Sequence, residues 1–411
     1  MKNYRRQIML CFCAMLLIGC TETPSEVREE ISELDAVSAA EHENDFTDTL
    51  TDIALLEQDI QQTLQDKNGT IVLKSCFVPH KTELHTYTLS LCDSTDLQTD
   101  FNSLWNLTMQ RDQSEYAENI SVFEDTLPLT KIDVTDVSAL HLQNNVRTLG
   151  CYPKSETDAD SLVMGVTQHG AYNFMRCADF VVSPYLIDTI KTETVYDAEH
   201  LDSVVYRMHN QTEWSVSDAA SYAASAFHNI SHDDFCTYQA MYVQAKRIAD
   251  DAGYGYWMMM NRVAPDGVQL YPFMNLKDSP VNSLTEMILP DYSWIWCTEK
   301  DRIQELHKAE CFQVQSTAGI AQVIPLSAAK KIAESALAGA RTYRVECRLC
   351  YCIKLYGTQV AALTGNDFSE ALAYHDYSSI VCEPYWVFTD ANSGDEIRYL
   401  VNAQTGAFEI R

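Results

Sequence analysis

Apolar and polar positions follow their clearest pattern in the last part of the chain, from Val323 to Arg411. Between Ala329 and Ala340 apolar residues recur at every third or fourth position, which is the spacing of one face of a helix. Lys330, Lys331 and Glu334 occupy the opposite face. The pattern therefore predicts an amphipathic helix whose apolar face lies on the protein and whose charged face lies in water.

After this helix the period of the pattern changes. Apolar residues alternate with other residues from Tyr343 to Leu355, which predicts a long β-strand. Three shorter strands are predicted at Tyr385–Thr389, Ile397–Val401 and Ala407–Arg411, with turn-forming residues between them. The chain is therefore expected to end as an antiparallel meander beneath one helix.

Helical and strand patterns also occur near the start of the chain. Two helices are predicted at Leu50–Leu64 and Leu97–Met109, and two strands between them at Thr70–Val78 and Thr82–Leu91. From Gln110 to Asp160 the pattern weakens and predicts only scattered short strands.

A pattern similar to the final helix occurs in the middle of the chain. Ser217–Phe227 aligns with Ser327–Leu337 and shares several identical residues with it. A predicted strand at Tyr254–Met260, a turn at Ala264–Gly267 and a strand at Val268–Phe273 follow. Two related helix-on-sheet units are one interpretation. The other is that alanine-rich amphipathic helices resemble one another by composition.

The first residues have the features of an exported lipoprotein. A positively charged start precedes an apolar run, Ile8–Ile18, that is too short to span a bilayer. The sequence Leu17-Ile18-Gly19-Cys20 then fits a bacterial lipobox, which predicts cleavage before Cys20 and a palmitate-type lipid on its thiol. An ordinary signal peptide followed by a chance cysteine is the alternative. No other stretch reaches membrane-spanning length, so this lipid is the only membrane anchor predicted.

Composition narrows the possible partners. The chain has 411 residues, 46% of them hydrophobic, which is enough for two or three domains with packed cores. Its formal net charge of −29 makes nucleic acid and anionic membrane surfaces poor partners, because both require clusters of Lys and Arg. The acidity favours solubility outside the cell, and a specific role in cation binding is the alternative.

The cysteines do not form a recognisable disulfide scaffold. Cys11 and Cys13 leave with the signal peptide and Cys20 takes the lipid, so an odd number of the 14 cysteines remains. The one dense cluster is Cys347, Cys350 and Cys352, on the long predicted strand. Alternation places the second and third on one face and the first on the other, which argues against a tetrahedral metal site. Buried structural thiols and disulfides stay open as interpretations.

One other group of residues has metal-ligand spacing. His228 and His232 are four residues apart at a predicted helix end, and Asp233 follows, which makes the three weak candidates for a metal site. The zinc-protease motif fails because Asn229 stands where its glutamate would be. A solvated helix end explains the same residues. With no nucleophile elbow or phosphate loop present, the sequence predicts no catalytic residue and no cofactor.

A run of three methionines follows Trp257. Such a run can form a soft surface for a ligand or peptide. It can equally belong to a strand whose residues alternate between the core and the other face, which is the more ordinary arrangement.

Three segments in the final region carry a family resemblance: Ile324–Ala329, Pro384–Phe388 and Tyr399–Gly406. Together they resemble a PepSY-type module, whose closing turn reads Val-Asn-Ala-Gln-Thr-Gly in this chain. With the lipobox and an acidic segment after it, the whole chain resembles a family of uncharacterised Gram-positive bacterial lipoproteins. That family has no known catalytic residues to transfer.

Patterns and resemblance together predict the fold class. It is α+β, with antiparallel sheets each covered by an amphipathic helix, because no strand–helix–strand rhythm with glycine-rich turns occurs. Tyr292–Trp296 and Asp301–Phe312 are further predicted strands. The expected organisation is a lipoprotein signal peptide (1–20), an acidic flexible tether (21–49), an N-terminal α+β region (50–210), a middle helix-plus-sheet unit (211–322) and a C-terminal PepSY-like unit (323–411).

The resemblance implies a function. It suggests a non-enzymatic, lipid-anchored extracytoplasmic protein that binds a peptide or another envelope protein, in a regulatory or sensory role. An antiparallel sheet with an available edge can accept an extended peptide as an added strand. The alternative is an envelope solute-binding protein or hydrolase that uses scattered His and Asp residues.

Overall fold

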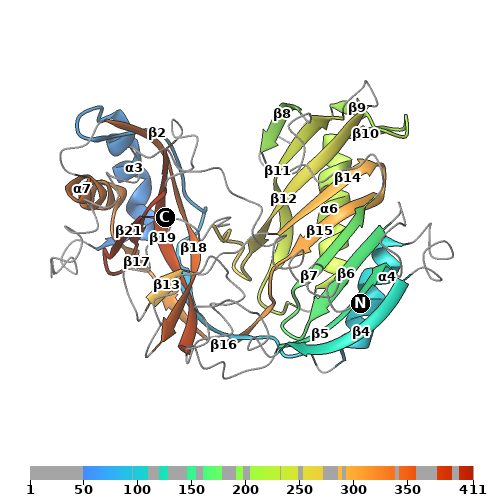
Figure 1. Ribbon diagram of the computed structural model, residues 1–411. Coiled ribbons are helices and arrows are strands. Elements are labelled where there is room, and N and C mark those ends of the chain that lie inside the picture. Colours follow the sequence, from blue (N-terminus) through green and yellow to red (C-terminus); the bar gives the residue numbers. More distant parts are fainter. Residues whose placement is uncertain are drawn as a thin grey trace.

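The computed structural model describes residues 50–94, 96–109, 120–127, 146–153, 161–177, 191–197, 204–231, 233–248, 253–271, 286–288, 293–337, 342–357, 377–390 and 398–410. These residues form an α+β protein built on two large sheets that lie side by side (Figure 1). One sheet contains nine strands and the other contains eight.

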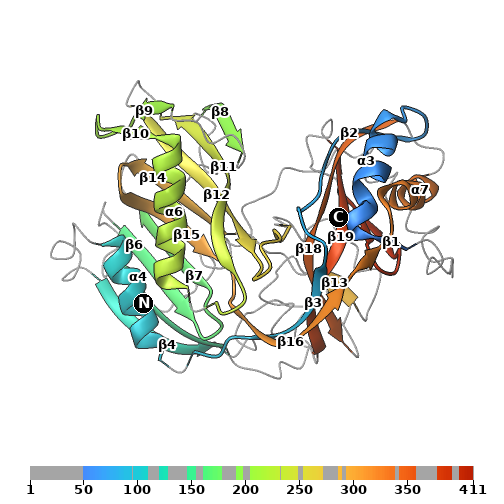
Figure 2. The same ribbon diagram turned by 180° about the vertical axis from the view of Figure 1, so that it is seen from behind.

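The nine-stranded sheet is antiparallel at every pairing and has the order β4-β5-β6-β7-β15-β14-β12-β11-β8. Its strands are β4 Ile120–Leu127, β5 Val146–Pro153, β6 Ser161–Thr167, β7 Tyr172–Cys177, β8 Lys191–Asp197, β11 Thr237–Arg247, β12 Tyr254–Val263, β14 Ser293–Glu299 and β15 Arg302–Lys308. Helices α4 Leu97–Thr108 and α6 Val216–Ile230 cover one of its faces (Figure 2). A short ribbon of β9 Val205–Arg207 and β10 Glu213–Ser215 leads into α6.

The eight-stranded sheet takes strands from both ends of the chain. They are β2 Ile71–Phe77, β3 Leu84–Leu91, β13 Glu286–Ile288, β16 Phe312–Ile320, β18 Tyr343–Gly357, β19 Tyr377–Asp390, β20 Arg398–Asn402 and β21 Phe408–Ile410. The four consecutive strands β18 to β21 pair antiparallel, which confirms the predicted C-terminal meander. One pairing departs from the expected antiparallel sheet, because β2 runs parallel to β18.

Two helices cover one face of this sheet. After β1 Thr51–Asp52 and the 3-10 turn Ile53–Leu55 comes α3 Leu56–Gln65, and α7 Leu326–Ala336 follows β17 Gln322–Val323. Strand β1 pairs with β17, and α3 contacts α7. The apolar faces of both helices join the large core cluster of this sheet.

The charged face predicted for α7 is only partly in water. Lys331 is exposed as expected, but Lys330 is buried. Its ammonium donates to Asp66 Oδ2 at 3.0 Å and to the carbonyl oxygen of Asn68 at 3.0 Å. The prediction placed a single helix on the sheet, whereas α3 lies beside α7 and its C-terminal end receives this side chain.

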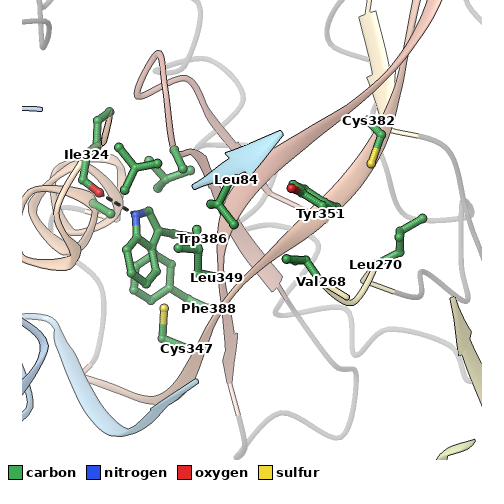
Figure 3. Packing of buried hydrophobic residues seen from close by; sticks show 14 of the residues in the cluster. Leu84, Val268, Leu270, Ile324, Cys347, Leu349, Tyr351, Cys382, Trp386 and Phe388 are labelled. Atoms are coloured by element: carbon green, nitrogen blue, oxygen red, sulfur yellow. Dashed lines mark hydrogen bonds between the residues drawn. The ribbon is translucent and has the colours of Figure 1, made fainter. Parts of the chain in front are cut away.

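The core of the eight-stranded sheet follows the predicted alternation. Alternate residues of β18 from Tyr343 to Ile353 enter one core cluster, together with Trp386 and Phe388 of β19. The indole of Trp386 is fully buried and its Nε1 donates to the carbonyl oxygen of Ile324 at 2.8 Å (Figure 3).

The closing turn of the PepSY-like segment is held by Asn402. Its Oδ1 accepts the backbone N–H groups of Gln404 and Thr405 at 2.9 and 3.0 Å, and Gly406 adopts a left-handed conformation. The residues that carry the family resemblance therefore have a structural role in this turn.

Strand pairing groups the segments differently from the expected ranges. We call the eight-stranded sheet with α3 and α7 the end unit, and the nine-stranded sheet with α4 and α6 the inserted unit. The expected N-terminal region, 50–210, is divided between them, because β2 and β3 pair with β18, β16 and β19 near the other end of the chain. The turn after β12 and strand β13 also reach the end unit. Of the predicted strand Val268–Phe273, the part up to Tyr271 is described, and it contributes isolated bridges at Gln269 and Leu270.

Candidate functional site

The sequence-predicted metal candidates do not meet in the described structure. His228 is exposed on α6, and His232 lies outside the described residues. The Asp233 side chain is fully buried and forms an ion pair with Arg262, with 3.3 Å between Oδ2 and Nη1. Within the described part of the chain, no group of three or more His, Cys, Asp or Glu side chains is arranged to hold a metal ion.

The three clustered cysteines lie on opposite faces of strand β18. Cys347 enters the main core of the end unit, whereas Cys350 and Cys352 lie in a smaller cluster on the other face. Burial raises the pKa of Cys347 and of Cys352 well above that of a free thiol. The three thiols therefore do not converge on one point.

The methionine run also alternates. Met258 and Met260 lie in the core beneath the helices of the inserted unit. Trp257 and Met259 lie on the opposite face with Trp296, and all three are buried. The run therefore fits the alternating-strand interpretation.

A polar network joins the two units where the turn after β12 reaches β3 and β18. Asp266 Oδ2 accepts a 2.5 Å hydrogen bond from the Tyr351 hydroxyl and lies 3.0 Å from His85 Nδ1. Burial disfavours the Asp266 carboxylate, but the hydrogen bonds from Tyr351 and His85 outweigh it and lower its pKa. Sequence patterns missed this network, because its members are far apart in the chain.

This network fixes the position of the turn. The Tyr351 hydroxyl also accepts the backbone N–H of His85 at 2.7 Å, and Asp266 Oδ1 accepts the N–H of Val268 at 3.0 Å. Each of these hydrogen bonds joins two groups of the protein. We therefore interpret the network as a structural connection between the two units rather than as a catalytic group.

A hollow of about 490 Å³ lies where β2 meets the start of β18. Lys67, Lys74 and Arg344 line it, which is unusual in so acidic a chain. The Lys67 ammonium donates to the carbonyl oxygens of Leu64 and Leu73 at 2.6 and 3.2 Å, so it serves the end of α3. The hollow has no buried polar side chain aimed into it among the residues that line it.

The edge strand β16 is exposed along most of its length. Among the described residues it pairs only with β3, so its second edge has no described strand beside it. Residues 313–319 are all exposed, while Phe312 and Ile320 at the two ends are buried. The exposed residues are Gln, Val, Gln, Ser, Thr, Ala and Gly, with no charge and no proline.

The fold and this edge define a two-sheet α+β protein in which the uncharged strand β16 has one edge that no described strand occupies. No helix in the described part of the chain combines the length and apolar character needed to cross a membrane. Cys20, the predicted lipid site, lies outside the described residues.

No family model matches the chain, and no curated protein matches it. Among solved structures it is similar to the "Bacillus megaterium YpeB C-terminal domain", with a TM-score of 0.31 and 11% sequence identity. The match covers 78% of this chain and 98% of that one. A likeness at this level does not establish a shared fold or function.

Proposed function

We propose that the protein is a lipid-anchored, extracytoplasmic, non-enzymatic binding protein that takes an extended peptide segment of an envelope protein as an added strand on β16. The observation that supports this proposal is the open edge of β16, exposed over seven residues. Backbone N–H and C=O groups on such an edge can pair with any extended chain, and the adjacent side chains select the sequence.

The composition of this edge supports a use in binding. Proteins usually protect edge strands with lysine, proline or a short length, because open edges pair with other chains. β16 has nine residues and no charge or proline between Phe312 and Ile320. The one protective feature is a register shift between Val314 and Ser316.

The two ends of β16 are fixed, which favours binding in a second way. Phe312 and Ile320 are buried in the core of the end unit, and β16 pairs with β3 on both sides of the register shift at Val314 and Ser316. The backbone of the edge is therefore ordered before a peptide arrives, so little conformational entropy is lost from the protein on binding.

The predicted location fits an envelope partner. The lipobox ending at Cys20 and the acidic segment 21–49 support a body held near the outer face of the cell membrane by a flexible tether. The PepSY-like resemblance of the C-terminal residues supports a peptide or envelope protein as the partner.

Lipid anchoring is tested by replacing the acceptor thiol. Cys20→Ala removes the sulfur that forms the thioether, so the full-length protein should move from the membrane to the soluble or secreted fraction. Cys76→Ser, which changes a half-buried thiol in the folded body, is the matched control and should stay in the membrane fraction. Membrane retention of Cys20→Ala would contradict the lipobox.

Peptide binding is tested with displayed random peptides selected on the full chain. Ser316→Lys with Ala318→Lys adds two charges to the exposed strand, and the affinity of the selected peptides should fall by at least about tenfold. Gln61→Lys, an equally exposed change on α3, should leave the affinity unchanged. Failure to select any peptide, or equal affinity for all three proteins, would contradict the proposal.

A further inference from the structure

Two cysteines meet at the neck where the chain passes between the units. Cys92 follows the last residue of β3, and Cys311 precedes the first residue of β16. The register pairs Leu91 with Phe312, and the N–H of Cys92 donates to the carbonyl oxygen of Cys311 at 2.9 Å. Residues opposed in this way have Cα atoms roughly 4.5–5.5 Å apart, within the range that a disulfide spans.

A buried lysine lies against one of these sulfurs. Lys308 Nζ is 2.8 Å from Cys311 Sγ, and Lys308 is fully buried. The ammonium also donates to the carbonyl oxygen of Gly170 at 2.8 Å and lies 5.0 Å from the centroid of the Tyr172 ring. Within the described part of the chain, no carboxylate forms an ion pair with it. A buried cation needs an anionic partner, and the Cys311 sulfur is placed to be that partner.

The charges around the pair support a thiolate at Cys311. Two buried cations, Lys308 and Arg262, face one carboxylate, Asp233, which Arg262 already engages. The hydrogen bond from Cys92, with the positive charges of Lys308 and Arg262, lowers the pKa of Cys311 against the effect of burial. The same thiol–thiol hydrogen bond and burial raise the pKa of Cys92. The two sulfurs are therefore inequivalent, because their surroundings favour the thiolate at Cys311 and the protonated thiol at Cys92.

We propose that Cys92 and Cys311 are a redox-active pair that hydrogen peroxide converts to a disulfide, which joins the two ends of the inserted unit. Peroxide is the oxidant because it is close to water in size, and both sulfurs are buried. A disulfide here connects β3 to β16 at the point where the chain leaves and re-enters the end unit.

The chemistry takes two steps. The Cys311 thiolate attacks peroxide, an S–O bond forms, the O–O bond breaks, and the departing hydroxide takes a proton to become water. The Cys92 sulfur then attacks Cys311 sulfur, an S–S bond forms, the S–O bond breaks, and hydroxide leaves with the Cys92 proton as a second water. The two sulfurs lose two electrons in total, and peroxide gains them.

Lys308 makes the reaction reversible as well as fast. Oxidation removes the thiolate and leaves the buried ammonium without its anion, which stabilises the reduced form relative to the disulfide. Dithiols should therefore reduce the bond readily. This behaviour is that of a switch rather than of a permanent structural disulfide.

The chain contains its own comparison pair. Cys76 of β2 and Cys347 of β18 are register partners on neighbouring strands. Burial, followed by the hydrogen bond with Cys76, raises the pKa of Cys347. Cys76 is half-buried, whereas Cys92 and Cys311 are buried. If access alone governed oxidation, the Cys76–Cys347 pair would react first.

The proposal is tested by treating the reduced full chain with a limiting amount of hydrogen peroxide. The remaining thiols are then alkylated, and the linked peptides are identified by mass spectrometry. A Cys92–Cys311 link should appear before any Cys76–Cys347 link and should disappear with dithiothreitol. Lys308→Met should slow its formation at least about tenfold, because one unit of thiol pKa changes the thiolate fraction about tenfold. Lys308→Arg, which keeps the charge, should form the disulfide at a rate within about threefold of that of the natural protein. Cys297→Ala should form it at the same rate as the natural protein.

Three results would overturn the proposal: no link between Cys92 and Cys311, earlier oxidation of Cys76–Cys347, or an unchanged rate in a folded Lys308→Met variant. The order of the two links is measured in the natural protein, so the proposal can fail even if the Lys308 variants do not fold. Circular dichroism of each variant establishes whether its rate is interpretable.

Discussion

The two units use the same layers, a sheet with two helices on one face, but they depend on the rest of the chain to different degrees. Helix α6 of the inserted unit carries its own N-cap, since the Ser215 side chain accepts the N–H of Asp218 at 3.1 Å. Helix α7 of the end unit has no side-chain cap of its own at Pro325. Its Ser327 N–H donates to Asp59 Oδ2 of α3 at 3.2 Å.

This difference shows that the end unit is completed by residues from the opposite end of the chain. The first described residues contact the last ones in three ways. Strand β2 pairs with β18, helix α3 packs on α7, and the buried Lys330 ammonium donates to Asp66. The C-terminal segment 323–411, which by sequence looks self-contained, therefore lacks a neighbouring strand and a neighbouring helix when taken alone. The two helices and nine strands of the inserted unit all lie between Leu97 and Lys308, a range interrupted by the turn after β12 and by β13, which reach the end unit.

The largest effect is expected in the core of the end unit. Trp386→Ala removes a fully buried indole and its hydrogen bond to Ile324, and should lower the free energy of unfolding by about 3–5 kcal/mol. Denaturant unfolding of the full chain measures this. Lys331→Ala on the exposed side of α7 should change stability by at most about 0.5 kcal/mol. Equal effects of the two substitutions would contradict the packing of this unit.

A pH-dependent effect is expected in the inserted unit. Burial, and then the charge of Lys308, lower the pKa of His307 to about 4 from 6.5. The unfolded chain therefore binds a proton that the folded chain excludes between pH 6.5 and pH 4, so stability falls as pH falls through this window. The loss should reach about 3 kcal/mol.

His307→Gln is the matched variant for this prediction, because its amide can still donate to Asn173 Oδ1, which lies 2.6 Å from His307 Nδ1. Denaturant unfolding at a series of pH values compares the two proteins. The variant should lose about 3 kcal/mol less than the natural protein between pH 7 and pH 4. Identical pH profiles would show that His307 titrates normally.

A smaller effect tests the link between the two ends of the chain. Lys330→Ala removes a buried side chain that donates to Asn68 carbonyl oxygen, and should cost about 1–3 kcal/mol in unfolding free energy. Lys331→Ala, its neighbour on the same helix, is the control. A cost as small as that of the control would show that α3 and α7 are not joined through this lysine.

The smallest effect concerns the local cap of α6. Ser215→Ala removes the acceptor for the Asp218 N–H and should cost about 1 kcal/mol. Ser221→Ala, within the same helix and exposed, should cost less, because its hydroxyl bonds only the Ser217 carbonyl oxygen one turn earlier. Equal costs in denaturant unfolding would remove the contrast between a self-capped α6 and a dependent α7.

Local patterns predicted individual elements well. The alternation from Tyr343 to Leu355 and the helical spacing after Ser217 correspond to β18 and α6, because these signals come from residues adjacent in sequence. The parallel pairing of β2 with β18 could not be predicted, because it depends on a contact between distant segments. The burial of Lys330 has the same cause.

The candidate sites also differ in how much of each can be predicted from residues adjacent in sequence. The charge-free composition of 313–319 is visible in the sequence, but the open edge becomes evident only once β3 is known to occupy the other side. Cys92 and Cys311 have no sequence signature, since their approach depends on the strand register at the neck. The histidine spacing that suggested a metal describes an exposed helix end at His228.

Hydrogen–deuterium exchange of the full chain, with and without a peptide selected on it, tests strand addition to β16 most directly. Binding should slow exchange of backbone amides within 313–319, because the open edge gains hydrogen-bond partners. Exchange in β21, which pairs with β20 on a separate branch of the same sheet, should not change. Protection at β21, or binding without protection at β16, would contradict peptide binding by this edge.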